Sequence, residues 1–107
     1  MSYSDQELAD ALVALGILKR YPDEKDWWIY AIADGEPGGM IARKAVRDWR
    51  VAGAVMELLL KKQDFRMSAQ FLDSNTVAVL IVGESEGQDK SLPRAICEAG
   101  VEALNND

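Results

Sequence analysis

The sequence predicts a single α+β domain in which a small antiparallel β-sheet packs between helices. Three observations lead to this prediction. A chain of 107 residues suits one domain. Apolar residues recur at helical spacing in three segments, which are separated by segments with the patterns of strands. The hydrophobic fraction of 49% and the charged fraction of 28% are ordinary for a folded domain. The expected order is helix, strand, helix, strand, strand, helix.

The first helix is predicted from about Ser4 to Leu15. Ser4 and Glu7 have the spacing of a capping box, in which each side chain accepts a hydrogen bond from the backbone N–H of the other residue. Gly16 is expected to end the helix in the left-handed conformation, and Ile17 to make the hydrophobic contact that accompanies such an end. The apolar face of this helix carries Leu8, Ala11, Leu12 and Leu15.

A loop and a strand are predicted next. Residues 19–26 are polar, charged and interrupted by a proline, so we interpret them as a loop. Trp27–Ala33 is rich in aromatic and branched residues, which is typical of a strand. The glycine-rich residues 34–39 are expected to form a turn. Residues 40–46 are compatible with a strand, a loop or the start of a helix.

The second helix is predicted to begin near Asp48, whose carboxylate can accept hydrogen bonds from the first amides. Lys61 and Lys62 bring positive charge to the negative end of its dipole, and Gln63 closes it. Its apolar face carries Val51, Val55, Leu58 and Leu59, widened by Ala52 and Met56.

A hairpin and a third helix complete the prediction. Phe65–Leu72 alternates between apolar and polar residues and is joined by a short polar turn to Thr76–Gly83. The second strand is apolar on both faces, so we expect it to be central and covered on both sides, one of them by the N-terminal element or a partner. Residues 84–90 are interpreted as an acidic loop, and Ser91 as the cap of the last helix. Its apolar face carries Ile96, Cys97, Gly100, Val101 and Leu104.

Composition restricts the function. The net charge is −6, so phosphate backbones and anionic lipids repel the chain. The chain has no histidine, which removes the commonest general base and metal ligand, and its one cysteine cannot form an intramolecular disulfide. No signal peptide or apolar run of membrane-spanning length is recognisable. We therefore expect a cytoplasmic protein without a cofactor, without a metal and without enzymatic activity.

Two segments carry a resemblance to a known family. They are Asp48–Glu57, DWRVAGAVME, and Ser91–Leu104, SLPRAICEAGVEAL. The chain resembles, over roughly Leu8 to Leu104, the phage ABA sandwich domain, a family of small phage and prophage accessory proteins. The resemblance implies an α/β/α sandwich and a phage or prophage origin, and it implies no catalytic residue. The region from Trp27 to Val46 departs most from the family pattern, so a specific function is expected there.

The predicted partner-binding surface lies in that region. It comprises Trp27, Trp28, Tyr30, Asp34 and Glu36. Adjacent tryptophans on a strand point to opposite faces, so one indole is exposed if only one face of the sheet is covered. Exposed aromatic side chains are typical anchors of protein interfaces. The alternative is that both faces are covered and the aromatic rings belong to the core.

Other candidate residues favour structural interpretations. Cys97 lies on an apolar helix face without a histidine to activate it, and is expected to be a small buried hydrophobe. The acidic loops lack the regular spacing of a calcium site, and the glycine-rich turn contains two acids that would oppose a phosphate. The sequence thus predicts no catalytic, cofactor-binding or metal-binding residue.

The leading hypothesis is an interaction protein that binds a host or phage protein, for example an inhibitor of a host defence or regulatory complex with an anti-CRISPR-like action. Acidic inhibitors can occupy basic grooves by charge complementarity. One alternative is a nucleic-acid-binding accessory protein, and another is a phage structural or assembly protein; self-association into a homodimer is also open. The nucleic-acid alternative would use Arg43, Lys44, Arg47, Arg50, Lys61 and Lys62 on one face.

Overall fold

The computed structural model describes residues 3–22, 28–32, 39–62, 66–73, 76–81 and 85–105. Its elements are α1 (Asp5–Ala14), β1 (Leu18–Pro22), β2 (Trp28–Ile32), α2 (Ala42–Ala45), α3 (Trp49–Lys62), β3 (Met67–Asp73), β4 (Thr76–Ile81), β5 (Ser85–Asp89) and α4 (Leu92–Asn105). Strands β1 and β2 form one antiparallel sheet, and β3, β4 and β5 form a second one in that order. The predicted α+β class is confirmed.

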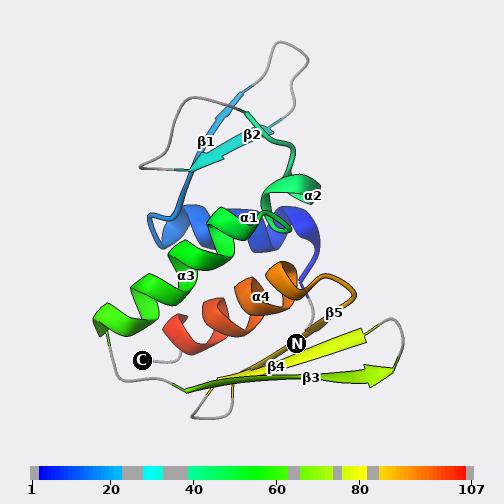
Figure 1. Cartoon of the computed structure of the whole chain (residues 1–107). Helices are drawn as coiled ribbons and strands as arrows, with labels where there is room; N and C mark the ends of the chain where they lie inside the picture. The colour runs from blue at the N-terminus through cyan, green and yellow to red at the C-terminus, as the bar shows by residue number, and fades with distance from the viewer. Residues whose placement is uncertain are drawn as a thin grey trace.

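The layers differ from the expected sheet between helices. The helices lie between the two sheets, with the β1–β2 hairpin at one end of the molecule and the three-stranded sheet at the other (Figure 1). Strand β4 is central in its sheet, as predicted, and α4 packs over β4 and β5. Among the described residues, all helices lie on the same side of this sheet (Figure 1).

The ends of α1 follow the predicted chemistry. The Ser4 Oγ accepts a hydrogen bond from the Glu7 N–H at 3.1 Å, and the Glu7 Oε1 accepts one from the Ser4 N–H at 2.9 Å. At the other end Gly16 has a φ of +81°, and the Ile17 N–H donates to the Leu12 carbonyl at 3.0 Å. Ile17 and Leu12 are both buried, so the helix end is anchored in the core.

The β1–β2 hairpin corrects one prediction. Residues of the expected loop form β1, which pairs with β2 from Leu18 opposite Ile32 to Pro22 opposite Trp28. Leu18 is buried, whereas Lys19 and Arg20 are exposed, and Arg20, on the same face as Leu18, reaches Asp10 of α1 with its guanidinium. A strand of this kind has too few apolar residues to be recognised from its composition. Strands β2 and β4 lie within the predicted ranges, and β3 extends one residue beyond its predicted end, to Asp73.

The other missed strand is β5, which lies in the expected acidic loop. It is polar apart from Gly87, and it is a strand because it pairs with β4 along its whole length. A Cβ at Gly87 would lie 2.2 Å from the Ala95 carbonyl oxygen, so only glycine allows α4 to approach the sheet this closely. The backbone contact thus replaces the side-chain contact that a typical strand residue would make.

The core lies where α3 crosses α4 and where α4 covers the sheet. Val51, Val55 and Leu59 of α3 are fully buried. A Cβ at Gly100 would lie 2.2 Å from the Val55 Cγ1, so the two helices are in close contact at this glycine. None of the described helices has both the length and the apolar character needed to cross a membrane.

Candidate functional site

The predicted partner-binding surface is only partly visible and is wrong for Tyr30. Trp27, Asp34 and Glu36 lie outside the described residues, and of Trp28 only the backbone, at the start of β2, is described. Tyr30 is 0% exposed. It lies in the middle of β2, with β1 on one side and a bridge to Met40 on the other, and belongs to the core. Tyr30 therefore cannot anchor a partner.

The hydroxyl of Tyr30 has an internal role instead. It donates a hydrogen bond of 2.7 Å to the Asp10 Oδ1, and Gln6 contacts the same hydroxyl. The Arg20 Nη1 donates to the Asp10 Oδ1 at 2.9 Å. Burial and the hydrogen bond to Asp10 raise the pKa of Tyr30 to about 12. Burial would raise the pKa of Asp10 as well, but the hydrogen bonds from Tyr30, Gln6 and Arg20 lower it. This cluster ties α1 to the β1–β2 hairpin.

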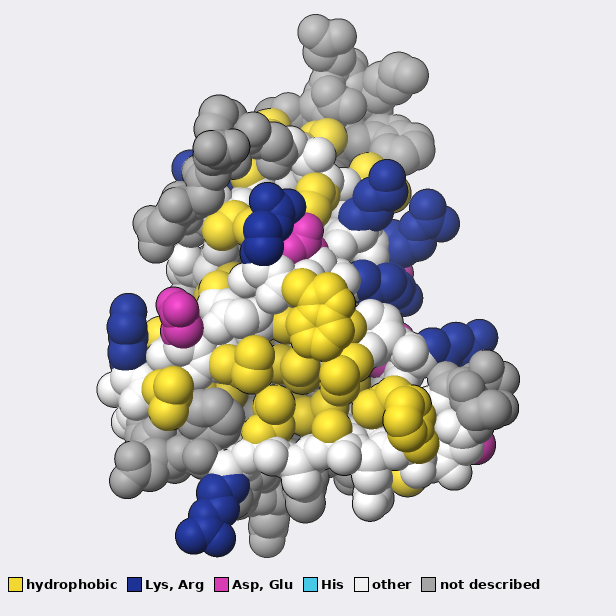
Figure 2. Space-filling view, in the orientation of Figure 1, with side chains coloured by type: hydrophobic (Ala, Val, Ile, Leu, Met, Phe, Trp, Pro, Cys, Tyr) yellow, Lys and Arg dark blue, Asp and Glu magenta, His cyan; other side chains and the backbone are white. Residues whose placement is uncertain are grey.

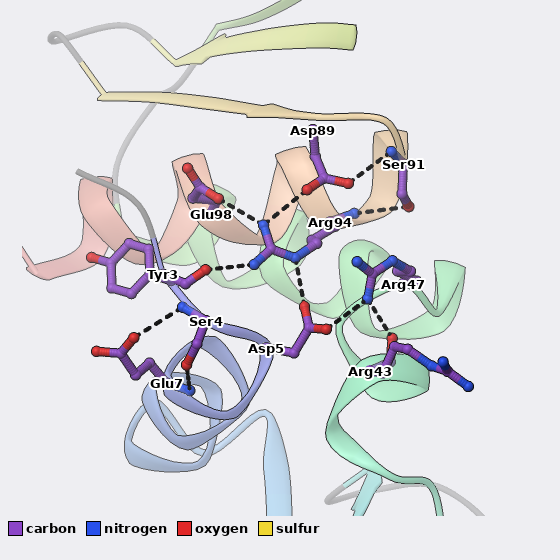
Figure 3. Close-up of polar contacts among 10 residues, drawn as sticks. All are labelled: Tyr3, Ser4, Asp5, Glu7, Arg43, Arg47, Asp89, Ser91, Arg94 and Glu98. Atoms are coloured by element: carbon purple, nitrogen blue, oxygen red, sulfur yellow. Dashed lines mark hydrogen bonds and ion pairs between the residues drawn. The ribbon is translucent and has the colours of Figure 1, made fainter. Parts of the chain in front are cut away.

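A second polar cluster surrounds the buried side chain of Arg94 (Figure 3). Its Nε donates to the Asp5 Oδ1 at 2.8 Å, and its Nη1 donates to the Asp89 Oδ2 at 3.0 Å and to the Glu98 Oε2 at 2.9 Å. Its Nη2 donates to the Tyr3 carbonyl at 2.6 Å. The cluster joins the start of α1, the end of β5 and the first turns of α4.

The electrostatics of this cluster are those of a satisfied structural network. Burial alone would raise the pKa of Asp5, but the hydrogen bonds from Arg94 and Arg47 outweigh it and lower the pKa. Burial keeps the pKa of Glu98 raised even though Arg94 favours its charged form. Within the described part of the chain, no buried side-chain nitrogen or oxygen lacks a hydrogen-bond partner. The network therefore offers no free group to a ligand.

Cys97 is buried, as predicted, in the interior of α4. Burial raises the pKa of its thiol to about 12, so the thiolate that would act as a nucleophile is suppressed. Among the residues that the structure describes, no three Cys, Asp or Glu side chains are grouped so that they could hold a metal ion.

Five of the six basic residues considered for nucleic acid line two hollows. Arg43, Lys44 and Arg47 line one of about 540 Å³ together with Met40 and Asp48, over α2. Lysine and arginine side chains gather there in Figure 2. The other hollow, of about 380 Å³, lies between α3 and the α1–β1 turn. Arg50 and Lys61 line this hollow, and Arg50 forms an ion pair of 2.9 Å with Asp48. These basic residues are therefore divided between two hollows, and the expected single basic face stays a prediction.

The most prominent surface feature is apolar. Hydrophobic side chains gather over α3, α4 and the three-stranded sheet, with Lys and Arg side chains around them (Figure 2). Phe71 is 81% exposed, Leu60 64% and Trp49 60%, although such side chains are usually buried. We call the surface made by Trp49, Met56, Leu60, Met67 and Phe71 the apolar face.

The geometry of α3 and β3 produces the apolar face. Trp49, Met56 and Leu60 are spaced by seven and four residues, so they form one stripe along α3 beside its buried stripe. On β3, Phe71 lies opposite Val77 of β4. Residues opposite each other in a sheet point to the same side, and Val77 is buried on the helix side. The Phe71 side chain thus points to the helix side at an edge that α4 does not cover.

Sequence reasoning missed the apolar face, although one signal was present. Leu58, Leu59 and Leu60 follow one another on α3 and are spread over about 200° of the helix circumference. That arc is wider than a single buried stripe, so at least one leucine had to face outward. Trp49 gives no such signal, because it lies among Arg43, Arg47 and Arg50, where an aromatic residue is also typical of a nucleic-acid contact.

Comparisons of the chain with protein-family models, with curated proteins and with solved structures find no match. The resemblance to the phage ABA sandwich domain stays a prediction from Asp48–Glu57 and Ser91–Leu104.

Proposed function

We propose that this chain is a phage- or prophage-encoded accessory protein that acts by binding another protein through the apolar face. The observation that carries the proposal is the exposure of the large apolar side chains Trp49, Leu60 and Phe71, in a molecule whose hydrophobic side chains gather over α3, α4 and the three-stranded sheet (Figure 2). Tryptophan is the residue most enriched among the side chains that dominate binding energy at interfaces. An exposed apolar surface of this kind lowers the solubility of a protein, so we expect a partner that covers it.

The size of the surface supports a protein partner. A large aromatic side chain has about 150–250 Å² of surface, so Trp49 and Phe71 alone expose about 300 Å². The largest apolar patch on a typical monomer covers about 300–600 Å² and is often functional. The two hollows are open and lined by charged residues, whereas sites for small ligands are usually enclosed and mostly apolar. They therefore do not favour a small apolar ligand as the partner.

The net charge of −6 supports a class of partner. An acidic chain is attracted to proteins that carry basic grooves, and it is repelled by free nucleic acid. A nucleic-acid-processing complex of a host defence or regulatory system has such grooves, and its inhibition in the anti-CRISPR manner is the specific form of the proposal. The net charge and the family resemblance support this form of the proposal.

The hollow over α2 supports a second candidate function, the binding of nucleic acid. Arg43 and Lys44 are exposed on its rim, and Arg47 is held in place by an ion pair of 3.1 Å with Asp5. A gel-shift titration at low salt tests this candidate. Binding that is lost in the Arg43→Ala/Lys44→Ala variant would favour it, whereas the absence of a shift at high protein concentration would eliminate it.

Affinity capture from bacterial lysate tests the leading proposal. The tagged chain is compared with Trp49→Ser and Phe71→Ser, and with Tyr21→Ser as a matched control. Tyr21 is an exposed aromatic on β1, in the other sheet. We expect one dominant protein that both surface variants lose and the control retains. Capture that is equal in all four proteins would contradict the role of the apolar face.

A further inference from the structure

Strand β3 is an unusually unprotected sheet edge. It lies at the outside of the β3–β4–β5 order, and all seven of its residues are exposed. Between Arg66 and Asp73 the sequence has neither a charged residue nor a proline. Proteins normally place charges, prolines or covering segments at such edges, because an open edge pairs with other strands. The opposite edge, β5, carries two acidic residues and lies under α4.

The side chains of this edge are also uncovered. Met67, Ala69 and Phe71 lie opposite Ile81, Val79 and Val77 of β4. The β4 valines are buried beneath α4, whereas the three β3 residues on the same side are exposed. The helical layer therefore stops one strand short of the sheet edge. The apolar side of the sheet continues beyond it as an apolar ledge, which Met67, Ala69 and Phe71 form.

We propose that a second copy of this chain occupies this edge, so that two β3 strands pair antiparallel about a two-fold axis near Ala69 and Gln70. The inference rests on the proposed function, since it names a partner for the same apolar face. The two three-stranded sheets become one sheet of six strands, with the helices of both copies on the same side. The two ledges then join into one apolar floor between the two helical layers.

Self-complementarity favours a second copy over another strand. The strand begins after a cation, Arg66, and ends in an anion, Asp73. Antiparallel pairing about a central axis brings the cationic end of each strand to the anionic end of the other. The residues between them are uncharged, so no like charges face each other along the shared edge. A bulge at Leu72 limits the regular pairing to the first five residues of β3.

The available area matches the requirement of a dimer. The exposed parts of Trp49, Leu60, Met67 and Phe71 amount to about 500 Å² per copy. A standard interface buries about 800 Å² per partner, and homodimer interfaces are about 65% apolar. The required apolar area is therefore about 500 Å² per copy, which the exposed side chains provide.

Sedimentation equilibrium of the full chain between about 1 and 100 µM tests the pairing. We expect a dimer, and a dissociation constant that rises about 30-fold or more in Phe71→Lys, because an interface anchor is replaced by a charge. Phe71 is exposed in the single copy, so at concentrations below the dissociation constant this variant should melt like the wild type. Tyr21→Lys is the matched control and should leave the dimer intact.

Disulfide trapping tests the register. Cysteine introduced by Ala69→Cys or by Gln70→Cys lies next to its counterpart at the axis, so one of the two should crosslink under mild oxidation. The Ser68→Cys counterparts would be about 8 Å or more apart, beyond the reach of a disulfide. Cys97 is buried and does not compete.

Two outcomes would overturn the pairing: a chain that stays monomeric at the highest concentration, or a dimer that Phe71→Lys leaves intact and that neither cysteine traps. Such failure is distinct from failure of the proposed function. A monomer that still captures a different protein through Trp49 would end the second-copy inference and leave the binding function standing.

Discussion

Replacement of Arg94 by methionine should destabilise the domain more than a change at any exposed charge. Arg94 is 6% exposed, and its guanidinium is the shared partner of three carboxylates and one carbonyl. Methionine preserves the unbranched stem but leaves the buried Glu98 without its cation. Breaking a buried ion pair in this way costs about 3 to 5 kcal/mol. Since a domain of this size has a free energy of unfolding of about 5–15 kcal/mol, the loss would be a large fraction of the total.

The loss of unfolding free energy in Arg94→Met should be larger at neutral pH than at acidic pH. Glu98 already has a raised pKa, so the folded state binds its proton more tightly than the unfolded state does. Removal of Arg94 raises the pKa of Glu98 further. A raised carboxyl pKa stabilises the folded state at low pH, and this contribution is lost as pH rises through the folded pKa. The variant should therefore be closest to the wild type near about pH 5 and furthest from it at neutral pH.

Urea unfolding followed by far-UV circular dichroism at the two pH values measures both effects. The double variant Arg94→Met/Glu98→Leu removes the stranded charge and should recover about 1 kcal/mol or more. A loss below about 1 kcal/mol in Arg94→Met, or a deficit that is independent of pH, would refute the assignment of Arg94 as the centre of a buried network.

Three further predictions concern the core. Gly100→Ala should destabilise the domain by about 1–3 kcal/mol, because the new Cβ meets Val55. Gly53→Ala, which has open space around it, should stabilise α3 by about 0.5–1 kcal/mol. Equal melting temperatures of the two variants would contradict the close contact between α3 and α4. Tyr30→Phe should cost about 1–3 kcal/mol at neutral pH. Because the lowered pKa of Asp10 contributes stability that is lost as pH falls through it, the difference should shrink in melts at strong acid; a constant difference would argue against the bond. In urea, Cys97 should react with a thiol reagent no faster than the chain unfolds, because its thiol is buried. Rapid labelling of the native chain without urea would contradict this burial.

The elements that the sequence predicted well are those with local signals. The capping box of Ser4 and Glu7 and the left-handed Gly16 depend on neighbouring backbone groups, so they can be recognised without knowledge of the fold. The β3–β4 hairpin was likewise visible from alternation and a short turn. By contrast, β1 and β5 are strands because of their partners. Strand β5 is polar apart from Gly87, and β1 has two charged residues and a proline among its five, so nothing local indicates the pairing.

The candidate site shows the same division. The burial of Cys97 followed from its place on an apolar helix face. The exposure of Trp49 and Phe71 depends on where the helical layer ends above the sheet, which the pattern of either segment alone does not contain. Tyr30 was placed in the predicted surface because aromatic residues on a strand suit interfaces, with the core as the alternative. The bridge from Tyr30 to Met40 and the packing of α1 place it in the core.

Hydroxyl-radical footprinting of the chain, alone and with its captured partner, tests the binding role of the apolar face most directly. Trp49, Met67 and Phe71 are reactive and exposed side chains on that face, and Tyr21 is the exposed aromatic away from it. We predict that the partner protects Trp49 and Phe71 and leaves the labelling of Tyr21 unchanged. Unchanged labelling of Trp49 and Phe71, with protection elsewhere on the chain, would contradict the proposal that this face binds the partner.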